Sequence, residues 1–390
     1  MKITGVQALV CDAGWRPWIF CRVTTDQGIT GYGECTDNRN PRAVLGAIDD
    51  LRDLVMGRDP RHTEMIYWDL YRATRHSVGG VVQKGIAGID LALWDIKAKA
   101  LGVPVYELLG GPTRDKVRLY WTHFGTYRIS HGDHLGTPPI RSLEDIAELA
   151  RGVVERGFTA LKTNALLVGE RPQVISAGFG GGYGSTDRNL GRAELRQVEA
   201  LIRTIRDAVG DDFEIAIDLN FNFAPQGFIR IARALEPYDL SWIELDIYDP
   251  RALLQVKEST SIPICSGESL YTTRGYRPYF ELHSMDIAML DVPWNGFTAA
   301  KKIADLAEAY EVSICPHNYY SHLSTLISGH LCACVPNVRI MENEVEDVPW
   351  KDDIVTSVPV IDEGHLLIPS TAGWGADLDE DQIARHPWEV

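Results

Sequence analysis

The chain has 390 residues, enough for a barrel of about 250 residues together with a second domain of about 100. Hydrophobic residues make up 45% of it and charged residues 24%, as in an ordinary globular protein. The formal net charge of −16 argues against nucleic acid and anionic membranes as partners. It does not exclude a small anionic substrate, because a metal ion and a few Lys or Arg side chains can reverse the local potential.

The sequence shows neither a run of 18 apolar residues nor a cleavage site after MKITGVQALV. It therefore predicts no transmembrane helix and no signal peptide. The seven cysteines lack the spacing of a disulfide framework or of a zinc site. We expect a reduced, cytoplasmic setting.

The first 115 residues are predicted to form an α+β domain. Residues 1–35 alternate like paired strands with a hairpin at TTDQGITGYGE, and helical patterns follow up to residue 109. The loop 11–18 carries Arg16 and Trp18, and either a ligand lid or a loop packed on its own domain would fit it. The helix that begins near residue 85 is apolar nearly all round, so we expect it to be buried between domains.

From residue 117 the pattern alternates between strand and helix, which predicts a parallel sheet with right-handed crossovers over residues 116–345. The segment 346–390 is Pro-rich at its start and is expected to fold back onto the first domain. A Gly-rich insertion at 165–192 matches no phosphate-binding pattern, and we interpret it as an active-site lid.

Six polar residues stand at the ends of successive apolar runs. Asp218, Glu244 and Glu268 follow one another at intervals of 26 and 24 residues, close to the length of one strand–helix unit. The series continues in the same rhythm with the residues Asp291, His317 and Glu342. A (β/α) barrel places such residues around its active-site mouth. This spacing predicts a (β/α) barrel enzyme.

The residue types in this series indicate metal-assisted proton transfer. Asp218, Glu244 and Glu268 offer the oxygen ligands that Mg²⁺ prefers. His317 titrates near neutral pH, and Asp291 on the preceding strand is placed to hold it in one tautomer. The alternative for each acid taken alone is a strand-end surface residue, but three in register favour the metal site.

These motifs resemble the enolase superfamily, in its mandelate racemase-like group. The resemblance rests on LALWDIKAKALGVPVYELLGG, on the metal-ligand strands, on the His317–Asp291 dyad and on Glu342, and it covers essentially the whole chain. It implies an α+β capping domain, a modified TIM barrel of the (β/α)7β type, and abstraction of the proton α to a substrate carboxylate with Mg²⁺ as cofactor. It also implies a homo-oligomer, either a dimer or an octamer.

The second barrel strand departs from the family's racemases. They carry K-x-K there, whereas this chain has Lys162 and Asn164, a K-x-N resembling acid-sugar dehydratases related to galactonate dehydratase. Those dehydratases have a His two residues after the third-strand ligand, where this chain has Asn220. A single base on one face can remove the α-proton and then protonate the departing β-hydroxyl, so dehydration of an aldonic or aldaric acid is the favoured interpretation.

The remaining candidate residues are assigned to the substrate. Lys162 is interpreted as an electrostatic or hydrogen-bonding partner of the substrate carboxylate. Glu342 is interpreted as a hydrogen-bond partner on the eighth strand, which would bind the substrate carboxylate if it is protonated. Arg16 is the candidate second cation for a diacid. The full substrate-binding set comprises Asn164, Asn220, Glu342, Arg16 and Trp18.

Two other functions remain open. A cycloisomerase or an epimerase acting on a lactone or carboxylate would use Lys162 as the base on the opposite face. A non-catalytic binding protein that retained the metal site would explain Asn164 and Asn220 as lost catalytic positions. Deuterium incorporation from D₂O without loss of water would identify the isomerase, and sugar-acid binding without product would identify the binding protein.

Overall fold

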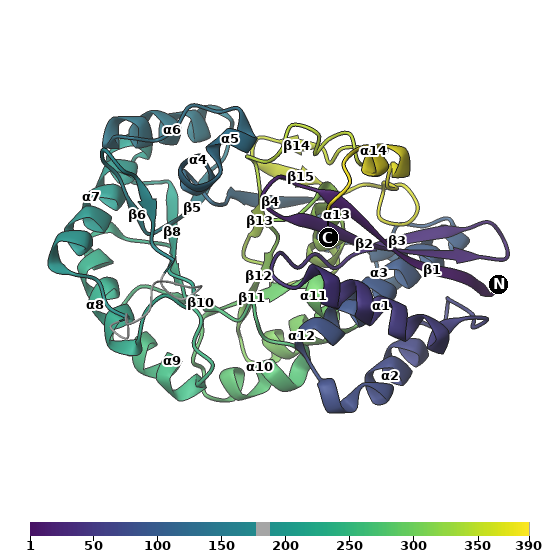
Figure 1. Cartoon of the computed structure of the whole chain (residues 1–390). Helices are drawn as coiled ribbons and strands as arrows, with labels where there is room; N and C mark the ends of the chain where they lie inside the picture. Colours follow the sequence, from purple (N-terminus) through teal and green to yellow (C-terminus); the bar gives the residue numbers. More distant parts are fainter. Residues whose placement is uncertain (177–187, 390) are drawn as a thin grey trace.

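The computed structural model describes residues 1–176 and 188–389, which form an α+β domain beside a barrel (Figure 1). The first domain holds an antiparallel sheet in the order β1-β2-β3 and three α-helices. Its elements are β1 Ile3–Asp12, β2 Pro17–Thr25, β3 Thr30–Glu34, α1 Pro41–Val55, α2 Thr63–Ala73 and α3 Gly80–Leu101. We call this part, residues 1–115, the capping domain.

Helix α3 is the buried centre of the capping domain, as its apolar pattern predicts. It packs on β3 so closely that a Cβ atom at Gly33 would lie 2.3 Å from the carbonyl oxygen of Gly88. Only glycine allows this approach between strand and helix. On its other side α3 contacts α11 (Val292–Asn295) and α12 (Phe297–Ala309) of the barrel, so one helix touches both parts of the molecule.

The barrel consists of parallel strands that alternate with helices. Strand order runs from β12 through β11, β10, β9, β8 and β5 to β4, and β13 pairs with β4. The strands are β4 Lys116–Trp121, β5 Ala160–Asn164, β8 Glu214–Asp218, β9 Trp242–Glu244, β10 Ile264–Ser266, β11 Ile287–Asp291, β12 Ser313–His317 and β13 Met341–Asn343.

The helices that follow the first seven of these strands form the outer layer seen in Figure 1. They are α6 Leu143–Glu155, α7 Arg192–Val209, α8 Pro225–Leu235, α9 Pro250–Lys257, α10 Thr272–Glu281, α12 and α13 His322–Cys334. Short helices α4 Thr126–Ser130 and α5 Gly132–Leu135 precede α6. The predicted (β/α)7β barrel with an α+β capping domain is confirmed.

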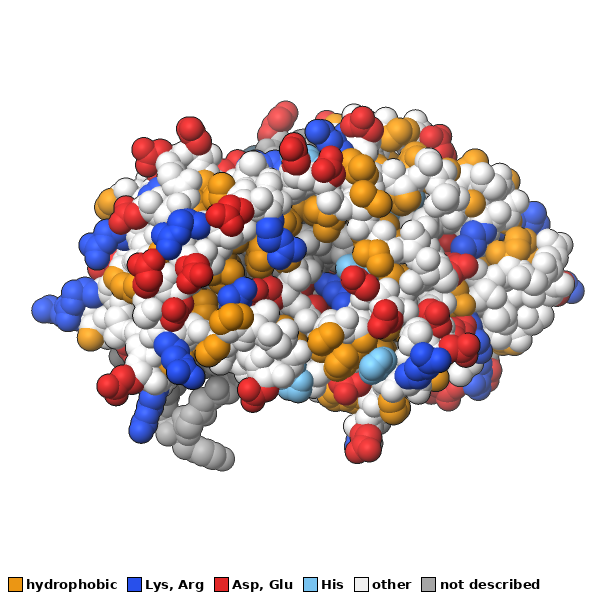
Figure 2. Space-filling view, turned by 90° about the horizontal axis from the view of Figure 1, so that it is seen from above, with side chains coloured by type: hydrophobic (Ala, Val, Ile, Leu, Met, Phe, Trp, Pro, Cys, Tyr) orange, Lys and Arg blue, Asp and Glu red, His pale blue; other side chains and the backbone are white. Residues whose placement is uncertain are grey.

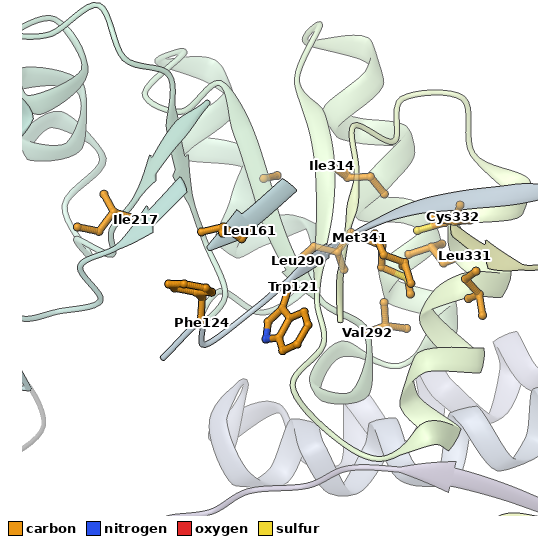
Figure 3. Packing of buried hydrophobic residues seen from close by; sticks show 14 of the residues in the cluster. Trp121, Phe124, Leu161, Ile217, Leu290, Val292, Ile314, Leu331, Cys332 and Met341 are labelled. Carbon is orange, nitrogen blue, oxygen red and sulfur yellow. The ribbon is translucent and has the colours of Figure 1, made fainter. Parts of the chain in front are cut away.

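Side chains alternate along each barrel strand between two buried layers. One layer faces the barrel interior and includes Tyr120, Trp242, Met289 and Cys315. The other packs against the helices, and Figure 3 shows part of it, including Leu161, Ile217, Leu290 and Ile314. The interior layer matters for function, because the next interior position on each strand lies at the carboxyl-terminal mouth of the barrel.

The chain beyond β13 contacts both parts of the molecule. Strand β15 (His365–Leu367) pairs antiparallel with β4 and with β14 (Ile361–Asp362). Further on, the indole of Trp374 donates to the carbonyl of Tyr32 at 2.9 Å. Helix α14 (Glu380–Arg385) lies beside the amino-terminal strands (Figure 1).

The Gly-rich insertion begins with a hairpin of β6 (Leu166–Leu167) and β7 (Gln173–Val174). Its centre, at 177–187, lies outside the described residues, so the lid interpretation stays a prediction there.

Acidic and basic side chains are interspersed on the face shown in Figure 2. Among the described residues, no helix is long and apolar enough to cross a membrane.

Candidate active site

The strand-end residues of the series share the interior face of the barrel. Asp218 stands two residues beyond Ala216, and His317 two beyond Cys315, so both continue the interior layer toward the mouth. Register aligns neighbouring strands: Asp218 pairs with Glu244, and Asp291 pairs with His317. The even spacing in the sequence therefore becomes convergence in space.

A cavity of about 360 Å³ opens at this mouth. The barrel supplies its floor and the capping domain supplies part of its wall. The lining residues from the barrel include His123, Thr126, Tyr127, Lys162, Asn164, Asp218, Asn220, Phe221, Glu268, Ser269, Trp294, His317, Tyr319 and Glu342. Those from the capping domain are Asp37, Asn38, Arg39, Asn40 and Lys84, and Val174, Ile175 and Ser176 come from the insertion.

His317 and Asp291 form a buried dyad. The Nδ1 atom of His317 lies 2.7 Å from Oδ2 of Asp291, which also accepts from the hydroxyl of Tyr320 at 2.5 Å. The other ring nitrogen, Nε2, lies 3.3 Å from Oε2 of Glu268. Burial opposes the charged imidazole, but Glu268, Glu342 and Asp291 outweigh it and raise the pKa of His317 to about 10. Asp291 therefore holds Nδ1 of His317, while Nε2 stays beside the carboxylate of Glu268.

Asp218 is held by the two amides of the K-x-N and D-x-N motifs. Its Oδ1 accepts from the backbone N–H of Asn220 at 2.8 Å, and its Oδ2 accepts from the side chain of Asn220 at 2.8 Å. Asn164 donates to the same Oδ2 at 3.3 Å, while its own carbonyl accepts from Thr126. Asn164 and Asn220 thus orient a carboxylate and also line the cavity.

Lys162 is bound on both sides by carboxylates. Its Nζ lies 2.5 Å from Oε2 of Glu244 and 2.9 Å from Oε1 of Glu342. Although burial opposes the charge, these two neighbours raise the pKa of Lys162 well above its usual range. Lys162 is therefore a fixed ammonium in the cavity floor rather than a free amine.

Glu342 accepts on both carboxylate oxygens. Oε1 accepts a hydrogen bond from the Thr122 hydroxyl and pairs with the Lys162 ammonium. Oε2 accepts a hydrogen bond from the backbone N–H of Asn318 at 2.7 Å. Burial is outweighed by Lys162 and His317, so the pKa of Glu342 falls below its usual range. The condition under which Glu342 would bind a substrate carboxylate, its protonation, is not met here, because each of its oxygens already faces donors.

The predicted metal ligands form a crowded, negatively charged group. Burial, together with Asp246 and Asp218, raises the pKa of Glu268 to about 8 in spite of His317. Asp246 itself accepts from Ser266 and from the backbone of Gly267, and so anchors the turn that carries Glu268. Within the described residues, the buried Oε1 of Glu244 has no hydrogen-bond partner.

These features test whether a divalent cation fits the site. In the described part of the chain, no three His, Cys, Asp or Glu side chains already stand in a geometry ready to hold a metal ion. The reason is visible in the contacts: Lys162 occupies one oxygen of Glu244, and the two amides occupy Asp218. The orphaned Oε1 of Glu244 and the raised pKa of Glu268 nevertheless match a hard cation, since this oxygen is still available as a ligand and a cation would stabilise the charged form of Glu268 that burial disfavours. The three carboxylates therefore supply the type of oxygen donor that Mg²⁺ takes.

The structure corrects the roles expected for Arg16 and Trp18. Both side chains are fully buried, and neither lines the cavity. Arg16 donates to Oδ2 of Asp347 at 2.8 Å and to the carbonyl of Tyr319 at 3.0 Å. Trp18 belongs to the core of β2. Arg16 thus ties the first hairpin to the loop that follows His317 and has no access to a substrate.

Several residues that line the cavity were not predicted from the sequence. His123 follows β4 and lines the cavity, with Nδ1 at 2.6 Å from Oε2 of Glu344; burial lowers its pKa to about 3. A search for polar residues just after the remaining apolar runs would have found His123. Lys84 and Asp37 pair at 2.7 Å, and the Lys84 ammonium lies 3.4 Å from the ring centre of Trp294. No sequence pattern marked this pair, because α3 brings Lys84 to the cavity only when it docks on the barrel.

Comparisons with known proteins agree with this architecture. Residues 6–110 match the mandelate racemase / muconate lactonizing enzyme amino-terminal domain, and residues 145–382 match the enolase C-terminal domain-like family. A D-xylonate dehydratase from Haloferax volcanii is 31% identical over 99% of this chain and 89% of its own length. A D-gluconate dehydratase from Thermoproteus tenax is 29% identical, over 96% of this chain and 71% of its own.

Solved structures are similar over the whole chain. One from Burkholderia xenovorans, with magnesium and fumarate bound and the provisional name L-alanine-DL-glutamate epimerase, has a TM-score of 0.97 at 39% identity and covers 100% of this chain and 97% of its own. A provisionally named dehydratase from Mesorhizobium loti has a TM-score of 0.86 at 29% identity, covering 100% and 99%. Both domain matches, the barrel with its capping domain and the end-to-end relatives lead to one conclusion: this chain belongs to the enolase superfamily, in its mandelate racemase and muconate lactonizing enzyme group.

Proposed function

We propose that the protein is a Mg²⁺-dependent dehydratase of an acid sugar, which it converts to a 2-keto-3-deoxy acid. One observation carries the choice of reaction. Nε2 of His317 faces the cavity with its dyad partner in place, whereas Lys162 on the second strand is locked between two carboxylates. A reaction that needs one proton-transfer group on one face fits this arrangement better than one that needs two.

Asp218, Glu244 and Glu268 would hold the metal ion. When bound, Mg²⁺ supplies positive charge at the substrate carboxylate, where negative charge develops as the α-proton leaves. The fixed ammonium of Lys162 adds a second cation in the cavity floor. Electrostatic stabilisation of this kind commonly lowers a barrier by several kcal/mol.

His317 carries out both proton transfers. Its Nε2 takes the α-proton, the C–H electrons form the C=C bond, and the C–O bond to the β-hydroxyl breaks. The same imidazolium then gives its proton to the departing oxygen, which leaves as water, and the enol product becomes the 2-keto acid. Glu268 contributes most to the raised pKa of His317. Neutralising Glu268 therefore lets the imidazole accept a proton near neutral pH.

The wall formed by the capping domain supports a polyhydroxylated substrate. Asp37 and Lys84 present an acceptor and a donor side by side, a combination that suits vicinal hydroxyl groups. The relatives named for D-xylonate and D-gluconate dehydration support an aldonic acid in particular.

Epimerisation is the second candidate. The neighbour with the provisional epimerase name is 39% identical to this chain, above the identity of the dehydratase relatives cited here. Lys162 would have to act as the second base, which requires it to leave both carboxylates. The doubly paired ammonium is therefore the observation against it.

The test is a screen of aldonic and aldaric acids with purified protein and Mg²⁺, in which 2-keto acid is detected as its semicarbazone. Activity that disappears with EDTA and returns with Mg²⁺ supports the proposal. Each acid is also incubated in D₂O and analysed by mass spectrometry. Deuterium at the α-carbon without loss of water would identify epimerisation instead and overturn dehydration.

A further inference from the structure

A carboxylate of the capping domain caps the barrel helix that follows His317. Glu34, at the end of β3, is fully buried and accepts four hydrogen bonds. They come from Thr36 and from the first turn of α13: the hydroxyl and N–H of Ser321 and the N–H of Ser324, at 2.5, 3.3 and 3.1 Å. The first N–H groups of a helix lack partners within it, so Glu34 satisfies one that α13 cannot.

A second such carboxylate caps the helix that follows Asp291. Asp90 of α3 accepts the N–H of Thr298 at 2.9 Å and its hydroxyl at 2.6 Å. Thr298 is the second residue of α12, whose own cap residue, Gly296, has no side chain to offer. A Cβ atom at Gly296 would lie 2.8 Å from Oδ2 of Asp90, so the glycine makes room for the foreign carboxylate.

The two contacts bear on the two members of the dyad. Ser321 is four residues beyond His317, and the loop between them reaches back to the site. In that loop Tyr320 donates to Asp291, and the N–H of Asn318 donates to Glu342. On the other strand, Asp291 accepts the N–H of Trp294 in α11, which leads directly into α12. A shift of either helix therefore moves a hydrogen-bond partner of the dyad.

We propose that Glu34 and Asp90 are positioning residues through which the capping domain aligns His317 with Asp291. They act through the helix N-termini of α13 and α12 and touch no substrate. The inference rests on the dyad being the proton-transfer machinery of the proposed function. It adds that the capping domain sets the geometry of this machinery as well as forming the wall of the cavity.

The kinetic test uses Glu34→Gln and Asp90→Asn, which keep the side-chain shape but replace one acceptor oxygen with a donor that faces donors. We expect kcat to fall by about tenfold or more, because small misplacements of reacting groups are costly. KM and Mg²⁺ affinity should stay within about threefold of the wild-type values. Ser142→Ala, which removes the cap of α6 away from the cavity, should leave kcat unchanged. Unchanged kcat in both test variants would overturn the proposal.

A second measurement does not depend on knowing the substrate. In protein labelled with ¹⁵N-histidine, the ring resonances of His317 are assigned by their loss in His317→Asn. We expect them to shift in Glu34→Gln and Asp90→Asn and to stay in place in Ser142→Ala. Shifts without detectable turnover of any acid sugar would refute the proposed function alone, and turnover with unshifted resonances would refute the positioning role alone.

Two further variants keep the test decisive if the first two do not fold. Ser321→Ala and Thr298→Ala each remove one hydroxyl donor to the buried carboxylate and leave its charge in place. Both should shift the His317 resonances in the same sense and lower kcat by a smaller factor. Wild-type spectra and wild-type kcat in both would overturn the proposal.

Discussion

Lys162 and Glu342 meet across the barrel interior, with Nζ 2.9 Å from Oε1. They come from β5 and β13, and neither side chain reaches solvent to any useful extent. Lys162 reaches Glu244 with the same nitrogen, so one ammonium neutralises parts of two buried carboxylates. Its removal tests how the site balances its charge.

Lys162→Met should destabilise the protein, because Glu244 and Glu342 would stay buried without their cation. Breaking buried pairs in this way costs about 3–5 kcal/mol. We also expect Mg²⁺ to raise the melting temperature of the variant more than that of the wild type, since a second cation then replaces the lost charge. Thermal unfolding with and without Mg²⁺ measures both effects. Equal melting temperatures of variant and wild type without Mg²⁺ would contradict the pairing described here.

His317→Asn should abolish turnover while Mg²⁺ binding persists. General acid–base groups contribute about 10²- to 10⁴-fold to a rate, and this variant loses the residue used in both proton transfers. Calorimetric titration with Mg²⁺ and the semicarbazide assay are the measurements. His283→Asn, the same exchange in an exposed turn, is the control and should behave as wild type. Substantial activity in His317→Asn would remove this residue from the mechanism.

Arg16→Ala should affect folding rather than the choice between mono- and diacids. The change leaves Asp347 buried and the carbonyl of Tyr319 without its donor. We expect a loss of about 3–5 kcal/mol in unfolding free energy. Arg52→Ala, which breaks an exposed pair with Asp49, should cost less than about 1 kcal/mol. A stable Arg16→Ala protein with an altered diacid-to-monoacid ratio would restore the substrate-binding role.

Stability should carry a pH dependence from the two positioning carboxyls. Burial, opposed by their hydrogen bonds, raises the pKa of Glu34 and of Asp90 to about 7. Because the folded-state pKa lies above the unfolded one, the stability that each contributes is complete below about pH 4 and is lost as the pH rises through 7. The loss is on the order of 3 kcal/mol for each group.

Denaturant unfolding at pH 5 and at pH 8 measures this dependence. The decrease in unfolding free energy between the two pH values should be smaller in Glu34→Gln and in Asp90→Asn than in the wild type. Comparing the decrease in each variant with the decrease in the wild type cancels the contribution of groups that titrate alike in both proteins. An identical decrease in all three proteins would show that the two carboxyls do not titrate in this range.

Much of the site could be predicted from the sequence because the pattern that marks its residues is local and periodic. Asp218, Glu244 and His317 each end a short apolar run, and parallel strands bring such ends together whatever the details of packing. Arg16 could not be placed in this way. Its partner, Asp347, lies 331 residues away, and no local pattern tells whether a hairpin side chain points into a cavity or into the core.

Lys84 and Glu342 show two further limits. Lys84 lies near the start of a helix, and only the docking of α3 on the barrel turns it toward the cavity. The position of Glu342 was predictable, but its ionisation was not, since that depends on donors from three separate segments. The expected dimer or octamer stays a prediction, which light scattering of the purified protein can decide.

The last forty residues have a consequence for protein engineering. Leu366 extends the sheet next to β4, while Trp374 and Glu380 bond to the amino-terminal strands. A chimaera that exchanges only residues 1–115 with a relative would leave these partners mismatched. Replacing the part of the cavity wall that the capping domain forms will therefore require the segments at both ends of the chain to be exchanged together.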